Sequence, residues 1–243
     1  MRGTLRTPLA LCTLLATASL AAVAASPSQA ATCGAGSYSY AGIGSRAVAS
    51  GVVATIAPTS TPRVRDGHVA GWVGVGGIGE GPDGMDEWIQ IGLTAKPQDT
   101  TSRIYYEIAR PLRKPVYVEL RHPVRTGEQH LFAVLELESR QGWWQVSLDG
   151  SPVGKPVFLA QSHANWSAQA VGESAGGGTS GACNLYSYAF KSVSFAHARD
   201  SVWSPFLNFE LFQDPFYRLV RTSRSSFLAQ SIATAPRTPV STP

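Results

Sequence analysis

The fold is decided by residues 71–93, GWVGVGGIGEGPDGMDEWIQIGL. This stretch predicts two apolar strands, Gly71–Val75 and Glu87–Leu93, joined by a glycine-rich loop that disfavours a helix. Successive side chains of a strand point to opposite faces. We therefore expect one face of the second strand to belong to the core, with Ile89, Ile91 and Leu93.

The opposite face of that strand carries Trp88, Gln90 and Gly92. A lone amide beside a large aromatic ring, on a surface otherwise made of glycine, is a place where a ligand could sit. The alternative is that Gln90 is an ordinary solvated residue of the strand.

The rest of the chain also divides into short β segments separated by turn-forming sequences. One of these, Asp149-Gly150, predicts a tight hairpin. No sustained helical period of apolar residues interrupts the pattern. We expect an all-β fold with two antiparallel sheets, a β-sandwich or jelly roll. The other expected strands are Ser37–Gly44, Val48–Ala57, Val69–Val75, Ser102–Ala109, Pro115–Arg121, Leu131–Glu138, Trp143–Leu148, Lys155–Ala160, Ser167–Ser174, Tyr186–Ala196 and Phe216–Arg221.

The first thirty residues have the layout of a secretory signal peptide. Arg2 and Arg6 precede an apolar run, and residues 28–30, SQA, form a small-x-small cleavage site. No later segment is long and apolar enough to span a membrane. We expect a freely secreted, extracellular protein with a signal peptide at 1–30, a β-sandwich domain at 31–228 and a disordered Pro/Thr-rich tail at 229–243.

The charge balance argues against a nucleic-acid partner. Removing the signal peptide takes two of the 20 basic residues and none of the 16 acidic ones, which leaves a net charge of about +2. No basic run with interleaved aromatic residues is present. The five histidines are scattered without metal-ligand spacing. We expect a monomer with no nucleic-acid or membrane partner, no metal and no cofactor.

The cysteines form one candidate pair. Cys12 lies in the signal peptide, which leaves Cys33 and Cys183. In an oxidising compartment two such cysteines most often form a disulfide, which would close a long loop and add several kcal/mol of stability. The alternative is two unpaired thiols.

Two motifs that suggest catalysis are better explained without it. Residues 172–176, GESAG, match the nucleophile elbow of α/β-hydrolases, but the glycine-rich run after Ser174 opposes the helix that an elbow requires. Glu136 and Glu138 share one strand face, like the paired carboxylates of glycosidases. A solvated strand face is the simpler interpretation of that pair.

Four segments, taken together and in order, resemble the glutamic peptidases, or eqolisins. GWVGVGG (71–77) with WIQIG (88–92) is similar to the W-V-G-x-x-G and L-Q-x-G motifs of that family. YYEIARP (105–111) resembles W-Y-E-W-x-P, TGE (126–128) resembles the G-D entry to a strand, and AQAVGES (168–174) resembles A-E-x-I-x-E-D/S. The chain departs from the family at Gly76 and Gln169, where the family carries acidic residues.

The resemblance implies a concanavalin A-like sandwich in which one sheet has a concave face. It implies that Gln90 and Glu173 act together on that face, in a metal-independent acid endopeptidase. Glu173 would be the general base that activates water, and Gln90 would stabilise the oxyanion. Peptide or protein would be the substrate, and the candidates for binding it are Trp72, Trp88, Tyr105 and Glu107.

A second class of function stays open. In a non-catalytic binding module, Trp72, Trp88 and Trp143 would form an aromatic platform for a glycan or a peptide. The peptidase hypothesis makes a sharper geometric demand, because it places Gln90 and Glu173 across the concave face, close enough for one water to touch both.

Overall fold

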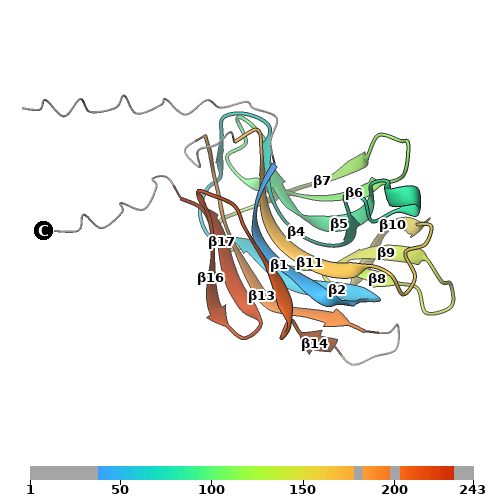
Figure 1. The fold of residues 1–243 in the computed structure, drawn as a ribbon. Helices are drawn as coiled ribbons and strands as arrows, with labels where there is room; N and C mark the ends of the chain where they lie inside the picture. Colours follow the sequence, from blue (N-terminus) through green and yellow to red (C-terminus); the bar gives the residue numbers. More distant parts are fainter. Residues whose placement is uncertain (1–37, 178–182, 198–202, 233–243) are drawn as a thin grey trace, which may run out of the picture. The chain divides into compact units, whose positions relative to one another are not determined.

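The computed structural model describes residues 38–177, 183–197 and 203–232. Regular structure in these ranges is β-strand, apart from one short 3-10 turn, η1 (Pro82–Gly84). The strands form two large antiparallel sheets that pack against each other as a sandwich (Figure 1), with a small third pair, β3 (Arg63–Val64) and β12 (Asn184–Leu185). The predicted all-β sandwich is thereby confirmed.

The first sheet has seven strands within the described residues and carries residues 71–93. In spatial order they are β15 (Phe209–Gln213), β1 (Tyr38–Val48), β11 (Ser167–Ala175), β4 (His68–Gly77), β5 (Glu87–Ala95), β6 (Ser102–Ala109) and β7 (Val116–Val124).

The second sheet has eight strands in the same part of the chain. In spatial order they are β10 (Ser151–Phe158), β9 (Trp143–Leu148), β8 (His130–Glu136), β2 (Gly51–Pro58), β13 (Ser187–Ala196), β17 (Ser226–Ser231) and β16 (Tyr217–Ser223), with β14 (Trp203–Pro205) paired to β13.

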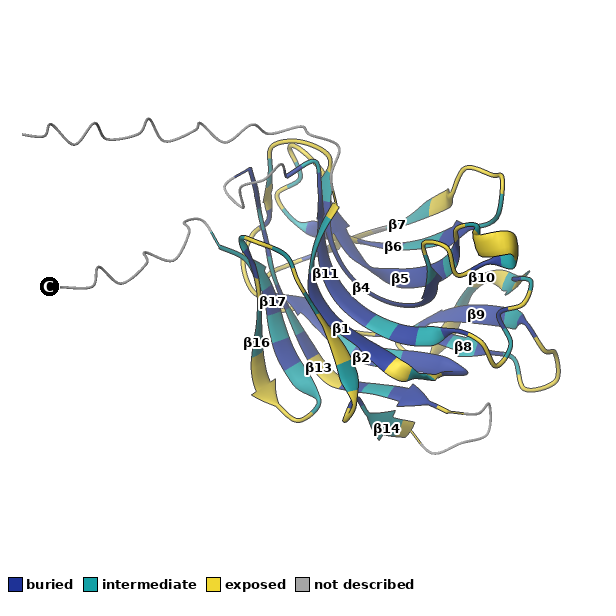
Figure 2. Cartoon of the chain, viewed as in Figure 1, coloured by how far each residue is buried: buried dark blue, intermediate teal, exposed yellow. Residues whose placement is uncertain are grey.

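The core lies between the two sheets (Figure 2). The predicted core face of β5 is confirmed, because Ile89, Ile91 and Leu93 are at most 1% exposed. They belong to the same apolar cluster as Phe132 and Trp144 of the second sheet. Removing this much apolar surface from water is the main force that holds the two layers together.

The outer face of the seven-stranded sheet is concave and has a smaller apolar cluster of its own. Ala70, Trp72, Tyr105 and Val171 form this cluster, with Tyr40 and Phe212 packed against it. The concave face therefore does not consist of solvated polar residues, as it would on a sheet exposed to water on that side. It forms the floor of the pocket described below.

The predicted hairpin at Asp149-Gly150 is present and joins β9 to β10. Both turn residues have positive φ, 51° for Asp149 and 80° for Gly150. A two-residue turn of this kind matches the right-handed twist of the flanking strands and favours Asp-Gly.

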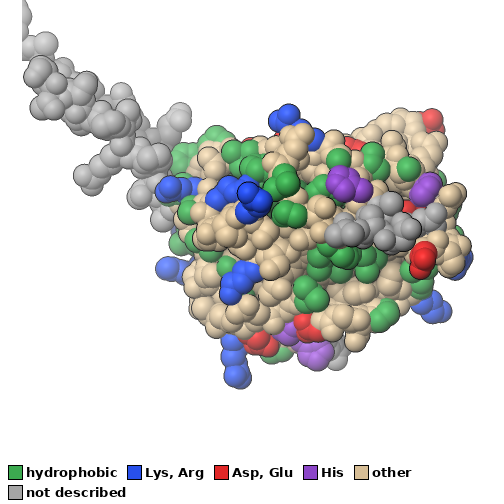
Figure 3. All heavy atoms as spheres, turned by 90° about the horizontal axis from the view of Figure 1, so that it is seen from below, with side chains coloured by type: hydrophobic (Ala, Val, Ile, Leu, Met, Phe, Trp, Pro, Cys, Tyr) green, Lys and Arg blue, Asp and Glu red, His purple; other side chains and the backbone are tan. Residues whose placement is uncertain are grey.

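The β-sandwich domain was predicted to end at residue 228, but it extends further. Strand β17 runs through Ser231 and pairs along its length with β13 and β16, so the sandwich extends into the predicted tail. The remainder of that tail, the predicted signal peptide and Cys33 lie outside the described residues. No helix in the described ranges is long and apolar enough to cross a membrane. On the face shown in Figure 3, Lys and Arg side chains are spread over several parts of the surface.

Candidate functional site

The candidate residues lie on the concave face of the seven-stranded sheet. Glu173 stands on β11 and Gln90 on β5, with β4 between them. In the ladder, Glu173 is opposite Ala70, and Gln90 is opposite Gly74 on one side and Glu107 on the other. The structure thus places both members of the predicted pair on one face of one sheet, but not level with each other. Ala70 and Gly74 are four residues apart on β4, and the β11 residue level with Gln90 is Gln169. That one water can touch both side chains stays a prediction.

A pocket of about 360 Å³ opens on this face. Its size is within the range of sites that bind small ligands or peptide side chains. It is lined by Tyr38, Tyr40, His68, Trp72, Gly74, Val75, Gly76, Gly77, Ile78, Asp86, Trp88, Ile89, Gln90, Glu107, Gln169, Val171, Glu173 and Phe212. Three of the four predicted substrate-binding residues, Trp72, Trp88 and Glu107, therefore line the same pocket as the predicted pair.

Both carboxylate oxygens of Glu173 accept hydrogen bonds from β4. His68 Nε2 lies 2.9 Å from Oε1, and Trp72 Nε1 donates to Oε2 over 3.0 Å. Glu173 is only 5% exposed, and a buried carboxylate requires such partners. The role of Trp72 is thus to hold Glu173 with its indole N–H, and Trp72 is itself buried, with 7% of its surface exposed.

Gln90 is held by the fourth predicted binding residue. Its Nε2 donates to the hydroxyl of Tyr105 over 3.0 Å. Tyr105 is 2% exposed and stacks on Tyr117 with ring centroids 5.3 Å apart. Burial, reinforced by the negative charge of Glu173, holds the pKa of Tyr105 well above its ordinary value. The hydroxyl therefore stays protonated, and Tyr105 lies below the pocket as a support for Gln90.

No hydrogen bond joins Gln90 to Glu173 among the contacts of the described residues, since each is held by other partners. On β4, Trp72 lies between the levels of Glu173 and Gln90, and glycines occupy the neighbouring ladder positions 74 and 92. A Cβ on Gly74 would lie 2.9 Å from Gln90 Cβ, and one on Gly92 would lie 2.6 Å from Trp72 Cα. A larger residue at position 74 would crowd Gln90, and one at position 92 would collide with the backbone of β4.

Glu107 is a second carboxyl group in the pocket. Burial raises its pKa above the ordinary value and the charge of Glu173 raises it further, whereas His68 and the Trp88 indole oppose the rise. The indole Nε1 of Trp88 is buried without a hydrogen-bond partner, although it lies near enough to Glu107 to affect that pKa. Two carboxyl groups in one pocket with different surroundings can hold different protonation states.

Three sequence interpretations are resolved elsewhere in the fold. Trp143 lies on β9 in the other sheet, where it packs against Phe158 and under Arg140, so the predicted platform of three tryptophans is wrong. Ser174 is fully buried inside β11 and accepts a hydrogen bond from Asn184, which agrees with the rejection of a nucleophile elbow. The third interpretation, that Glu136 lies on a solvated strand face, is wrong, because Glu136 is buried.

Glu136 is 5% exposed, although the sequence suggested a solvated residue. Its Oε1 accepts from the backbone N–H of Gly142 over 2.7 Å and lies 2.8 Å from His163 Nδ1. The reason is that β8 ends there and the loop before β9 folds over the carboxylate. Among the described residues, no group of three or more His, Cys, Asp or Glu side chains is arranged to hold a metal ion.

His68, the partner of Glu173, is a site residue that was not predicted from the sequence. His68 precedes Trp72 by four residues and therefore shares its strand face, a signal that was available. The contact itself depends on the pairing of β4 with β11, which are about a hundred residues apart in the chain and cannot be paired from sequence alone.

The fold is similar to that of two peptidases of known structure. One is scytalido-glutamic peptidase with a transition state analog inhibitor, with a TM-score of 0.57 and 13% identity over 80% of this chain and 98% of that chain. The other is SCP-B, a member of the Eqolisin family of peptidases, in a complex with the tripeptide Ala-Ile-His, with a TM-score of 0.52 and 14% identity over the same shares. At these identities the likeness establishes the fold.

No family model and no curated protein matches the sequence. By its fold, this protein is therefore an antiparallel β-sandwich, and its structural neighbours include eqolisin peptidases.

Proposed function

We propose that this protein is a secreted acid endopeptidase of the glutamic-peptidase type, acting without a metal through Glu173 and Gln90. The observation that carries the proposal is the single pocket that both side chains line, on the concave face of a sandwich similar to that of scytalido-glutamic peptidase. The proposed substrate is a peptide or an unfolded protein.

In the proposed reaction the ionised Glu173 takes a proton from a water molecule as the water oxygen attacks the peptide carbonyl. The carbonyl oxygen becomes an oxyanion, and the Gln90 amide N–H donates to it. The tetrahedral intermediate then collapses, the C–N bond breaks, and Glu173 returns its proton to the leaving nitrogen. The products are a carboxylic acid and an amine, and no covalent enzyme intermediate forms.

The contacts in the pocket support these roles. His68 and Trp72 fix the position of the Glu173 carboxylate by donating from the β4 side. One N–H of the Gln90 amide donates to the Tyr105 hydroxyl, and the amide carries a second N–H that a bound carbonyl can accept from. A base and an oxyanion donor held on rigid strands need little reorganisation during the reaction.

The test is an assay of the purified protein on an unfolded protein substrate from about pH 2 to pH 7. We expect cleavage on the acid side of neutrality. We expect Gln90→Ala to lower kcat/KM about a hundredfold, the cost of losing one oxyanion donor. Gln129→Ala, an exposed residue just before β8, is the matched control and should retain full activity.

Two outcomes would count against the proposal. Cleavage by wild type that Gln90→Ala leaves unchanged would remove Gln90 from the mechanism. Retention of peptide without cleavage at any pH would instead favour the non-catalytic binding module.

A further inference from the structure

The charged side chains that line the pocket are almost all acidic. Asp86, Glu107 and Glu173 are acidic, and His68 is the single basic residue among the lining side chains. The Nε2 of His68 is already 2.9 Å from Oε1 of Glu173. No Lys or Arg of the described chain lines this pocket.

Glu107 differs from Glu173 in having no strong partner. Glu173 is bonded by two donors, whereas Glu107 makes no ion pair within the described residues, and its polar neighbour is the Trp88 indole. It is half-buried and faces the pocket from β6. A partly desolvated carboxylate of this kind gains most from a cation that arrives with a ligand.

Aromatic rings form the wall near the mouth of the pocket. Tyr38 and Tyr40 are stacked, with ring centroids 6.3 Å apart and planes 11° from parallel, and Tyr38 is 55% exposed. The faces of such rings attract cations. The negative charges of Glu173 and Glu107 reach this wall, because both add to the effect of burial in raising the pKa values of Tyr38 and Tyr40.

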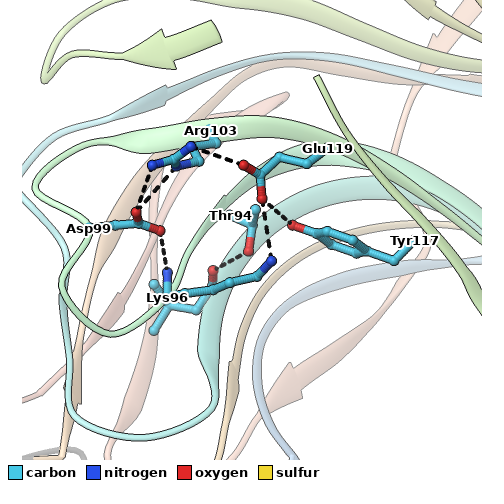
Figure 4. A network of polar contacts seen from close by, with 7 residues as sticks. Thr94, Lys96, Asp99, Arg103, Tyr117 and Glu119 are labelled. Carbon is cyan, nitrogen blue, oxygen red and sulfur yellow. Dashed lines mark hydrogen bonds and ion pairs between the residues drawn. The ribbon is translucent and has the colours of Figure 1, made fainter. Parts of the chain in front are cut away.

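Basic side chains do occur further along the concave face, but they are neutralised. Figure 4 shows Lys96 and Arg103 in contact with Glu119, and Arg103 also pairs with Asp99. This network lies outside the pocket lining. It therefore does not cancel the acidic character of the pocket.

We infer that the pocket selects a peptide with a positively charged side chain, Lys or Arg, and that Glu107 is the residue that recognises the charge. An anionic side chain would meet three carboxylates, and the hydroxyls of a neutral glycan could donate to Glu107 but would bring no charge to balance it. The inference rests on the proposed peptide-binding function of the pocket and names its substrate class.

The test measures binding, so that it does not depend on cleavage. The probes are four alanine-rich hexapeptides that differ at one position, which holds lysine, acetyl-lysine, norleucine or glutamate. They are titrated near pH 7 against the protein carrying Gln90→Ala, which slows turnover without changing the charge of the pocket. We expect the lysine peptide to bind about tenfold more tightly than the acetyl-lysine peptide, and the glutamate peptide to bind weakest.

The second arm assigns the charge recognition to Glu107. Adding Glu107→Gln should reduce the lysine preference to less than about twofold. Adding Glu210→Gln, an exposed residue of β15 in the same sheet but outside the pocket lining, should leave it unchanged. If Glu107→Gln fails to fold, salt provides the same test in the Gln90→Ala protein, because the preference should shrink toward unity near 1 M NaCl, where screening acts within about 3 Å.

Each outcome decides between the two proposals. Equal binding of the lysine and acetyl-lysine peptides overturns the inference, as does a preference that survives Glu107→Gln. A lysine preference in binding, in a wild-type protein that cleaves nothing, refutes the proposed peptidase function and leaves the inference standing.

Discussion

Each polar side chain of the pocket is held by a neighbour that the strand register supplies. Glu173 stands opposite Ala70, so the residues two before and two after Ala70, His68 and Trp72, flank its carboxylate. The side of β5 on which Gln90 lies could be predicted from alternation alone. Its contact with Tyr105 could not, because it depends on how β5 pairs with β6.

The raised pKa of Glu107 gives a prediction on pH. Burial first, and then the charge of Glu173, raises this pKa, so Glu107 becomes neutral at a higher pH than an ordinary glutamate. A neutral Glu107 cannot attract a cation, while lysine stays charged throughout. The preference for the lysine peptide over the acetyl-lysine peptide should therefore be small near pH 3 and grow as pH rises through the pKa of Glu107. Binding titrations at several pH values measure this ratio, and a ratio that falls with rising pH would contradict the assignment.

At the scale of strands and turns, sequence patterns were informative wherever one face of a strand is apolar and the other is not. Ile89, Ile91 and Leu93 occupy alternate positions of β5 and all three lie in the core, as that spacing predicts. Exposure alone does not show the alternation, because nearly every residue of β5 is buried. The short strands β3, β12 and β14 have two or three residues each and too few positions to show a period. They form because a neighbouring strand offers unpaired backbone groups, a tertiary effect that the local sequence does not carry.

The hairpin between β9 and β10 gives a prediction at this scale. Gly150 has a φ of 80°, a conformation that costs an L-residue roughly 1–3 kcal/mol. Gly150→Ala should therefore lower the free energy of unfolding by about 1 kcal/mol or more, since no neighbouring atom obstructs the added Cβ and backbone strain is the main cost. Chemical denaturation measures the change. Ser151→Ala, an exposed neighbour with ordinary strand geometry, is the control, and equal midpoints for both variants would refute the explanation.

At the scale of the whole molecule, the two sheets differ in what they bury. The eight-stranded sheet closes the core, while the seven-stranded sheet also carries a second, smaller apolar cluster on its outer face, beneath the pocket. The sequence could predict the sandwich from many short strands and turns. It could not show which tryptophans share a surface, and Trp143 was assigned to the wrong group because its sheet depends on the order of the strands in space.

The predicted disulfide between Cys33 and Cys183 belongs to this scale, because it would tie the start of the mature chain to the segment after β11. Peptide mapping by mass spectrometry without reduction should find the two cysteines in one linked fragment. Reduction should lower the free energy of unfolding by about 2–5 kcal/mol and should affect stability more than activity. Two thiols that react with an alkylating agent in the native, unreduced protein would contradict the prediction.

The central claim is that Glu173 is the base that activates water. The most direct test is kcat/KM for one peptide, measured across the acid pH range for wild type and for Glu173→Gln, which preserves size and can still accept from the Trp72 indole. General-base catalysis contributes roughly a hundredfold to ten-thousandfold, so we expect Glu173→Gln to fall by at least a hundredfold while its unfolding midpoint stays close to that of wild type. Glu210→Gln, an exposed residue of the same sheet outside the pocket lining, should keep wild-type activity. A folded Glu173→Gln protein that cleaves the peptide as fast as wild type would contradict the account.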